Sequence, residues 1–149
     1  MDLHPDLMDL LGAFSSSGVE YLVVGGWAVS VHSEPRFTKD LDLLIGVGAE
    51  NLERAARALR LFGAPDGIVA QAEGLGPDEF LFFGTPPARV DLLRSIPGVE
   101  FEQAFARRVD VEWGPTTVHV IARLDLIASK RAAGREKDLR DLRALERAE

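Results

Sequence analysis

The 149-residue chain contains no cysteine, so it can form neither disulfide bonds nor thiolate metal sites. No apolar run reaches the roughly 18–20 residues that a membrane-spanning helix needs, and the longest are short stretches such as residues 21–28. Basic residues are outnumbered, because 17 Lys and Arg stand against 24 Asp and Glu, for a net charge of −7. Such a chain repels nucleic acid on average, which disfavours a broad phosphate-binding face but leaves room for a local basic cluster.

The amino-terminal segment MDLHPDLMDL carries acids and lacks the basic region of a secretory signal peptide. We therefore expect a cytoplasmic protein that does not associate with membranes. Low-complexity segments and repeats of solenoid length are also absent. A hydrophobic fraction of 46% and a charged fraction of 28% are ordinary for a globular protein, and the length leaves room for one core. These features predict one folded domain over residues 1–149.

Hydrophobic periodicity predicts helices that alternate with strands. Helices are expected at residues 5–17, 27–33, 49–62, 101–108, 124–133 and 139–148, and strands at residues 21–24, 40–47, 79–83, 89–93, 109–113 and 116–121. Residues 68–77 have a weak pattern and are expected to form a short strand and a loop. This order favours an α/β or α+β domain with a mixed β-sheet. The C-terminal helices, about residues 123–149, are expected to pack on or near the site as a small subdomain or a lid.

The most informative segment is the predicted strand DLDLLI, which begins at Asp40. Side chains alternate along a strand, so Asp40 and Asp42 share one face while Leu41 and Leu43 share the other. Two carboxylates about 7 Å apart on one face repel each other when both are ionised. Solvent exposure, a basic partner or a divalent cation could each explain the pair. A D-x-D motif on an edge strand that merely faces solvent is the simplest alternative.

Asp91 is a lone acid in the apolar run RVDLL. If its strand neighbours the strand of Asp40 and Asp42, three carboxylates converge, and such a cluster is costly without cations. Two Mg²⁺ ions roughly 3.5–4 Å apart could then stabilise the attacking and leaving oxygens of a phosphoryl transfer. The alternative is that Asp91 is a surface acid or a helix cap.

Gly25 and Gly26 follow the first predicted strand and precede a short predicted helix. Glycines at such a point let the backbone approach a phosphate closely, and the helix N-terminus supplies N–H donors. A Gly-Gly pair alone is most often a turn. Neither the G-x-x-x-x-G-K-[ST] loop nor the G-x-G-x-x-G loop is present, which argues against a P-loop NTPase and a Rossmann dehydrogenase.

Taken together, the first strand, Gly25-Gly26, the short helix, Asp40-Leu-Asp42 and the later Asp91 resemble the DNA polymerase β-like nucleotidyltransferase superfamily. The strings GGWAVSVHSEPRFTKDLDLLI and LIASKRAAGREKDLRDL are similar to a small bacterial branch related to abortive-infection and toxin–antitoxin nucleotidyltransferases. This resemblance covers about residues 20–145. It implies a mixed-sheet nucleotidyltransferase core and an enzyme that transfers a nucleoside monophosphate from an NTP to an acceptor hydroxyl, with release of pyrophosphate. It also implies two Mg²⁺ ions, for which Mn²⁺ could substitute.

The same resemblance implies roles for individual residues. Asp40, Asp42 and Asp91 would be the metal ligands and catalytic acids, and Asp91 could also accept the proton of the attacking hydroxyl. The residues implied in nucleotide binding are Gly25, Gly26, Arg36, Thr38, Lys130, Arg135 and Asp138. Of these, Lys130 would reach a phosphate, and Asp138 would fix Lys130 or Arg135 in place.

Other charges of the C-terminal segment have a simpler interpretation. Many of them follow i, i+3 and i+4 spacing, which is typical of a solvated helix with surface ion pairs. Arg140, Arg143 and Arg147 are assigned to that surface.

Several questions stay open at this level. The acceptor could be a tRNA 3′ end, a protein hydroxyl or a small molecule, and the preferred NTP is undetermined. A protein partner or a second copy of the chain could complete the site. A non-catalytic nucleotide-sensing or antitoxin-like domain on the same fold is the main functional alternative, and an α/β interaction domain without a ligand is another.

Overall fold

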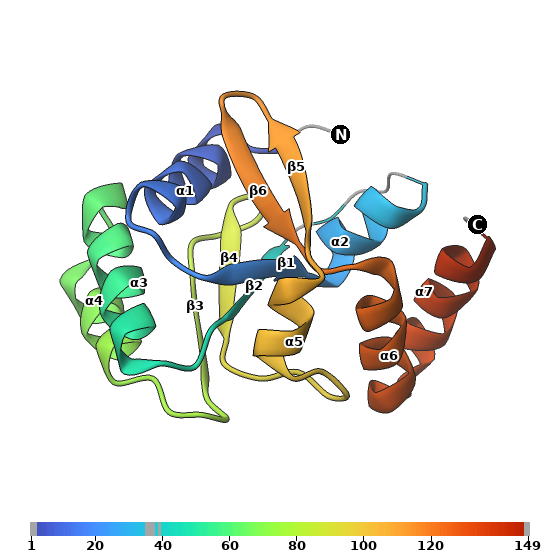
Figure 1. The fold of residues 1–149 in the computed structure, drawn as a ribbon. Coiled ribbons are helices and arrows are strands. Elements are labelled where there is room, and N and C mark those ends of the chain that lie inside the picture. Colours follow the sequence, from blue (N-terminus) through green and yellow to red (C-terminus); the bar gives the residue numbers. More distant parts are fainter. Residues whose placement is uncertain (1–2, 35–37, 39, 148–149) are drawn as a thin grey trace.

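A six-stranded mixed β-sheet organises the chain, and the order of its strands is β3-β4-β2-β1-β6-β5 (Figure 1). The computed structural model describes residues 3–34, 38 and 40–147. The strands are β1 (Tyr21–Val24), β2 (Asp40–Ile45), β3 (Phe80–Phe83), β4 (Arg89–Leu93), β5 (Val109–Trp113) and β6 (Thr116–Val120). The helices of the described part are α1 (Pro5–Ser16), α2 (Gly25–His32), α3 (Ala49–Phe62), α4 (Asp66–Glu73), α5 (Phe101–Ala106), α6 (Arg123–Ala133) and α7 (Glu136–Arg147). The expected α+β class with a mixed sheet and C-terminal helices is thus confirmed.

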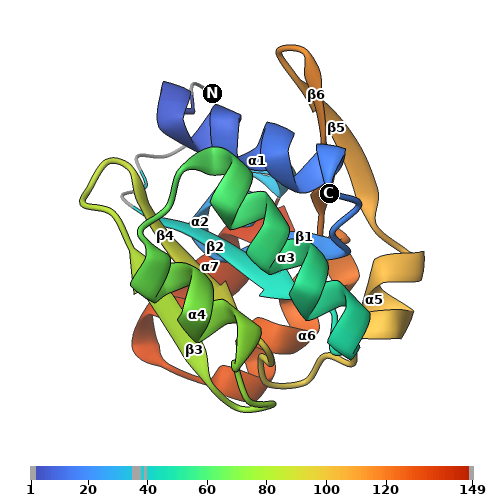
Figure 2. The same cartoon turned by 90° about the vertical axis from the view of Figure 1, so that its left-hand side faces the viewer.

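Helices cover both faces of the sheet. Figure 2 shows α1, α3 and α4 in front of the strands, while α6 and α7 lie behind them. None of the described helices is both long enough and apolar enough to cross a membrane.

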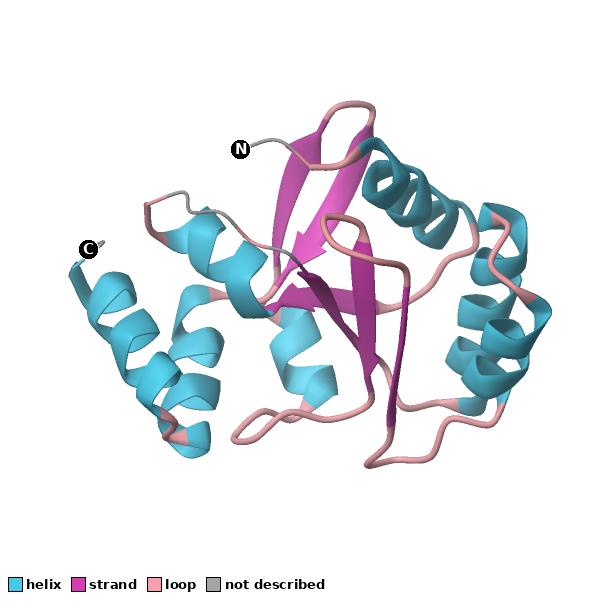
Figure 3. Cartoon of the chain, turned by 180° about the vertical axis from the view of Figure 1, so that it is seen from behind, coloured by secondary structure: helices cyan, strands magenta, loops and turns pink. Residues whose placement is uncertain are grey.

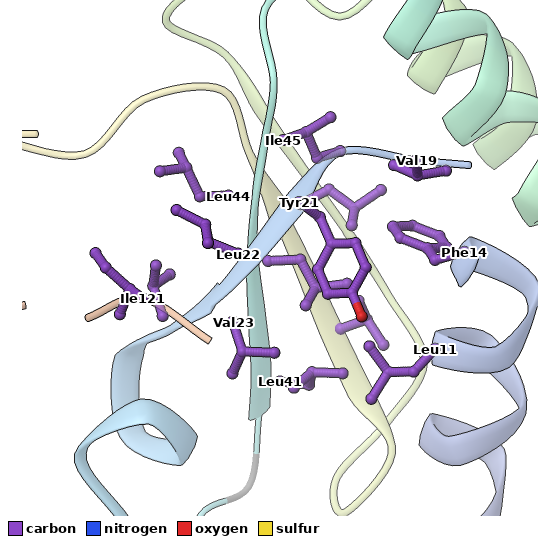
Figure 4. Packing of buried hydrophobic residues seen from close by; sticks show 14 of the residues in the cluster. Leu11, Phe14, Val19, Tyr21, Leu22, Val23, Leu41, Leu44, Ile45 and Ile121 are labelled. Atoms are coloured by element: carbon purple, nitrogen blue, oxygen red, sulfur yellow. The ribbon is translucent and has the colours of Figure 1, made fainter. Parts of the chain in front are cut away.

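The main core lies between β1, β2 and the helices α1 and α3 (Figure 4). Tyr21 is fully buried there, and its ring meets Phe14 of α1 edge to face at 5.7 Å. All four residues of β1 are buried, which explains why the sequence of this strand is continuously apolar rather than alternating.

The strand with the D-x-D motif is central, not an edge strand. It runs parallel to β4 on one side and antiparallel to β1 on the other. Leu41 and Leu43 are completely buried, whereas Asp40 and Asp42 retain some exposure on the opposite face. The alternation expected from the sequence therefore sets the acids on the face that also carries α6 and α7.

Two details of the local structure differ from the expectation. Residues 68–77 were expected to be a strand and a loop, but α4 spans Asp66–Glu73. This helix buries only Val69 and Ala72, so its apolar stripe is too short to give a helical period, and packing against α3 stabilises it instead. In addition, α2 begins at Gly25, so both glycines belong to the first turn of the helix rather than to a loop before it.

Candidate active site

Asp42 and Asp91 lie side by side on neighbouring strands. The register of the parallel pair β2–β4 sets Asp42 directly opposite Asp91, so both side chains leave the same face of the sheet. Burial raises the pKa of Asp42 from 3.8 to about 7, together with the charge and hydrogen bond of Asp91 and the charge of Asp40. Near neutral pH the Asp42 carboxyl is therefore partly protonated, which relieves its repulsion with the neighbouring carboxylates.

The backbone of Gly25 lies against the side chain of Asp42. Its φ is +66°, in the left-handed region that favours glycine. A Cβ atom at this position would collide with Oδ2 of Asp42. Two independent constraints thus require glycine here, and they let the start of α2 approach the carboxylate closely.

Asp40 and Asp91 share a basic neighbour on β4. Nε of Arg89 lies 3.0 Å from Oδ1 of Asp91 and 4.0 Å from Oδ1 of Asp40. The hydrogen bond with Asp91 raises the pKa of the Arg89 guanidinium above its usual value. Over the described ranges, no group of three His, Cys, Asp or Glu side chains is arranged to hold a metal ion. The structure therefore joins Asp42 to Asp91 and leaves Asp40 beside Arg89.

A cavity of about 690 Å³ opens beside Asp42. The backbone of Gly25 and Gly26 forms part of one wall, and the hairpin of α6 and α7 forms the other. Five basic residues line it, namely Lys130, Arg135, Lys137, Arg140 and Arg147. The volume is within the range of sites that enclose a nucleotide-sized ligand. The hairpin wall therefore carries five basic residues together with the acids Asp138 and Asp141, and it lies across the cavity from Asp42.

Lys130 is buried at the base of the basic wall. Its Nζ lies 3.0 Å from Oδ2 of Asp141 and 3.3 Å from Oδ1 of Asp138. Both acids are also buried. These ion pairs hold α6 against α7. They also largely neutralise the charge of Lys130, which was expected to reach a nucleotide phosphate.

Asp138 also holds Arg135, which lies between α6 and α7. It accepts hydrogen bonds from the Arg135 backbone N–H at 3.1 Å and from Arg135 Nε at 2.7 Å. Burial raises the pKa of Asp138, but the hydrogen bonds from Arg135 and the charge of Lys130 outweigh it, so the pKa lies below 3.8. Asp138 thus contacts both of the cations that the resemblance connected with it.

Three cations on the cavity wall were missed or assigned elsewhere by the sequence analysis. Lys137 was not singled out. Arg140 and Arg147 were assigned to a solvated helix surface, and both are exposed, but they also line the cavity. The charge of Lys137 lowers the pKa of Asp42, so Lys137 faces the acid pair. The missed signal is the stripe Lys137, Arg140, Ala144 and Arg147, which follows one face of a helix.

The residues of α2 and of the segment between α2 and β2 contribute less to the candidate active site. Thr38 has a buried hydroxyl with no hydrogen-bond partner among the described residues, and Arg36 lies outside them. His32 bonds through Nε2 to the carbonyl oxygen of Ile121 at 2.7 Å. Trp27 is buried and packs edge to face on Trp113 at 5.9 Å. The Trp27 and Trp113 rings therefore pack against the hydrophobic core.

Neither a protein-family model nor a curated protein matches this sequence. The donor set of the candidate active site fits a divalent cation, because Mg²⁺ favours one or two carboxylates with phosphate oxygens and water. The raised pKa of Asp42 is consistent with this fit, since a cation would take the place of the proton on Asp42 and offset the repulsion between the carboxylates. Basic residues across the cavity could bind an anionic ligand of that ion.

Proposed function

We propose that this protein is a Mg²⁺-dependent nucleotidyltransferase that moves a nucleoside monophosphate from an NTP to an acceptor hydroxyl. The observation that carries this proposal is the contact of Asp42 with Asp91 beside a 690 Å³ cavity whose far wall is basic. An acid pair next to a basic cavity suits a ligand that is both metal-bound and polyanionic. The resemblance of the Gly25-Gly26 and Asp40-Leu-Asp42 segments to nucleotidyltransferases supports the same activity.

Asp42 and Asp91 would hold the metal. Asp40 would become the third ligand once its carboxylate moves away from Arg89. The bound ion supplies charge stabilisation for the phosphate oxygens. Asp91 takes up the proton of the acceptor hydroxyl. The hydroxyl oxygen forms a bond to the α-phosphorus. The bond from that phosphorus to the oxygen that bridges the α- and β-phosphates breaks, and pyrophosphate leaves.

The triphosphate binds to the wall formed by α7. Lys137, Arg140 and Arg147 present their charges to the cavity, and opposite charges across a partly enclosed site bind phosphate well. Lys130 acts as a positioning residue, because its contacts with Asp138 and Asp141 hold α7 against α6.

Isothermal titration calorimetry with ATP, CTP, GTP and UTP in the presence of MgCl₂ tests the proposal. We expect at least one NTP to bind to the wild type, and Asp42→Asn to abolish metal-dependent binding. Asp9→Asn is the matched control, because Asp9 is an exposed acid of α1. Incubation with α-labelled NTPs, total cell RNA and lysate then identifies the acceptor by the fraction that gains label. Absence of binding for all four nucleotides would refute the proposal.

A nucleotide-binding domain without turnover, such as a sensor or an antitoxin-like protein, is the second candidate. The observation in its favour is Arg89, whose guanidinium already neutralises Asp91 and lies near Asp40. Tight binding of an NTP without transfer of label to any fraction would support this candidate, as would recovery of a stable protein complex.

A further inference from the structure

Arg94 is a buried cation without an acidic partner. It directly follows β4, and only 6% of its surface is exposed. Its guanidinium donates hydrogen bonds to the backbone carbonyls of Leu75 and Val47, the latter at 3.0 Å. These bonds use two of the five N–H donors, and the buried Nε has no partner among the described residues. Within that part of the chain, no carboxylate forms an ion pair with Arg94.

A buried guanidinium without a counter-charge is costly. Arginine keeps its charge in proteins, so release of a proton does not relieve the cost. Buried charges are therefore normally paired with opposite charges, and carbonyl groups supply only partial ones. Lys130, which is also buried, follows this rule, because Asp138 and Asp141 lie within 3.3 Å of its Nζ. Arg94 lacks the anion that Lys130 has.

Arg94 lines a second cavity of about 290 Å³. The cavity lies at the carboxyl ends of β2 and β4, which run parallel and finish at the same end of the sheet (Figure 3). Crevices at the carboxyl ends of parallel strands commonly hold ligands. The polar lining residues are Arg94, Ser95 and Glu100, and the apolar ones are Leu44, Val47, Pro77, Val99 and Phe101. The volume suits a small ligand, and the lining matches one with an apolar body and a charged end.

The segment that follows β4 separates this cavity from the candidate active site. Leu93, Ile96 and Pro97 line the larger cavity beside Asp42. Arg94, Ser95 and Val99 line the second cavity. The two cavities are therefore distinct, and a ligand of the second one contacts the segment that forms part of the wall of the first.

We propose that the second cavity binds a small monocarboxylate that has an apolar body. The carboxylate pairs with Arg94, because a planar guanidinium presents two parallel N–H groups to the two oxygens of a carboxylate. The apolar body packs against Phe101 and covers Val47, which lines the cavity although it is 53% exposed. This site goes beyond the proposed function and does not depend on it.

Glu100 narrows the class of ligand. It lines the same cavity, and its carboxylate accepts the backbone N–H of Gln103 at 3.2 Å. Its negative charge disfavours dicarboxylates and phosphates, which would bring a second anionic group beside it. An ammonium group would be attracted to it instead. A free branched-chain acid and an amino acid with the same side chain share the carboxylate and the apolar body, so the experiment must separate these two sources.

Titration of the protein with small acids, followed by amide chemical shifts, tests the inference. The ligands are isocaproate and L-leucine, with isocaproamide as the uncharged isostere and succinate as a dicarboxylate. Arg94→Gln removes the cation, and Val47→Asp supplies an internal carboxylate at the cavity. Because Val47 is exposed, this second variant keeps the test decisive if Arg94→Gln fails to fold. Leu61→Asp is the matched control, since Leu61 is an exposed apolar residue of α3.

We expect isocaproate or L-leucine to bind saturably. Isocaproamide and succinate should bind more weakly by about tenfold or more, as loss of a hydrogen bond to a charged group does. Arg94→Gln and Val47→Asp should both lose the binding, whereas Leu61→Asp should retain it. Tighter binding of L-leucine that is lost in Glu100→Gln assigns the site to an amino acid, and tighter binding of isocaproate assigns it to a free acid.

Absence of saturable binding for both acids up to about 10 mM would overturn the inference. Equal affinities for isocaproate and isocaproamide would also overturn it, as would wild-type affinity in Val47→Asp. Asp42→Asn should bind the acid like the wild type, because Asp42 lines the other cavity. Failure of NTP binding therefore leaves this inference intact, and failure of carboxylate binding leaves the proposed transferase intact.

Discussion

Asp42→Asn should stabilise the metal-free protein at alkaline pH. The folded protein holds the pKa of Asp42 at about 7, against 3.8 for an unperturbed aspartate. Between these values the folded state binds more protons than the unfolded state, so the free energy of unfolding falls as pH rises through this window. Asparagine resembles the protonated acid in shape and carries no charge, so the variant should lack this loss.

The size of the effect follows from the same pKa. The part of the window between pH 5 and pH 7 corresponds to at most about 3 kcal/mol, at 1.36 kcal/mol for each tenfold change in proton affinity. Asp42 keeps some contact with solvent, so we expect the measured difference to be about 1–2 kcal/mol. The difference should level off about one pH unit above the pKa of Asp42, where the folded state has released the proton.

Urea denaturation in the presence of EDTA measures this difference. The free energy of unfolding is determined for wild type and Asp42→Asn at pH 5 and pH 8, and the variant should gain relative to wild type only at pH 8. Asp9→Asn, the exposed control, should show the same free energy relative to wild type at both pH values. If Asp42→Asn gains equally at both pH values, or loses stability at pH 8, the Asp42–Asp91 contact does not create the shift.

Three further predictions concern the surroundings of Asp42. Arg89→Gln should raise the Mg²⁺ affinity several-fold in calorimetry, because it removes the cation that competes for the same carboxylates. Gly25→Ala should lower the free energy of unfolding by about 1–3 kcal/mol in urea titrations, since alanine disfavours a φ of +66° and its Cβ collides with Asp42. Lys130→Met should lower that free energy by about 3–5 kcal/mol, because it removes the cation that two buried acids share. Lys137→Met should leave stability unchanged and weaken NTP binding.

Each of these has a contradicting outcome. Unchanged Mg²⁺ affinity in Arg89→Gln would mean that the guanidinium does not compete with the ion. Wild-type stability in Gly25→Ala would show that the start of α2 can shift away from Asp42. Equal melting temperatures for Lys130→Met and wild type would remove its positioning role.

The strands and long helices could be predicted from the sequence because their patterns are strong. β1 is a continuous apolar run, and α3 has a full amphipathic repeat bounded by Gly48 and Gly63. α4 could not be found, because two buried side chains make no period and its stability comes from contact with α3.

The candidate site was predictable in part. Alternation along β2 set Asp40 and Asp42 on one face, but nothing local indicated that β4 would lie next to β2 in parallel with Asp91 opposite Asp42. That juxtaposition depends on the order of strands in the sheet, which is a long-range property. Arg89 was missed for a similar reason, because its contacts span two strands and a ring on a third.

The charges of the C-terminal hairpin are divided between two tasks. Lys130, Arg135 and the two buried acids form an ion-pair network that holds α6 and α7 together, while Arg140 and Arg147 line the cavity from the neighbouring stripe. Under the proposed function, substitutions on that stripe would alter ligand affinity without loosening the hairpin. Specificity could then diverge while the architecture stays constant.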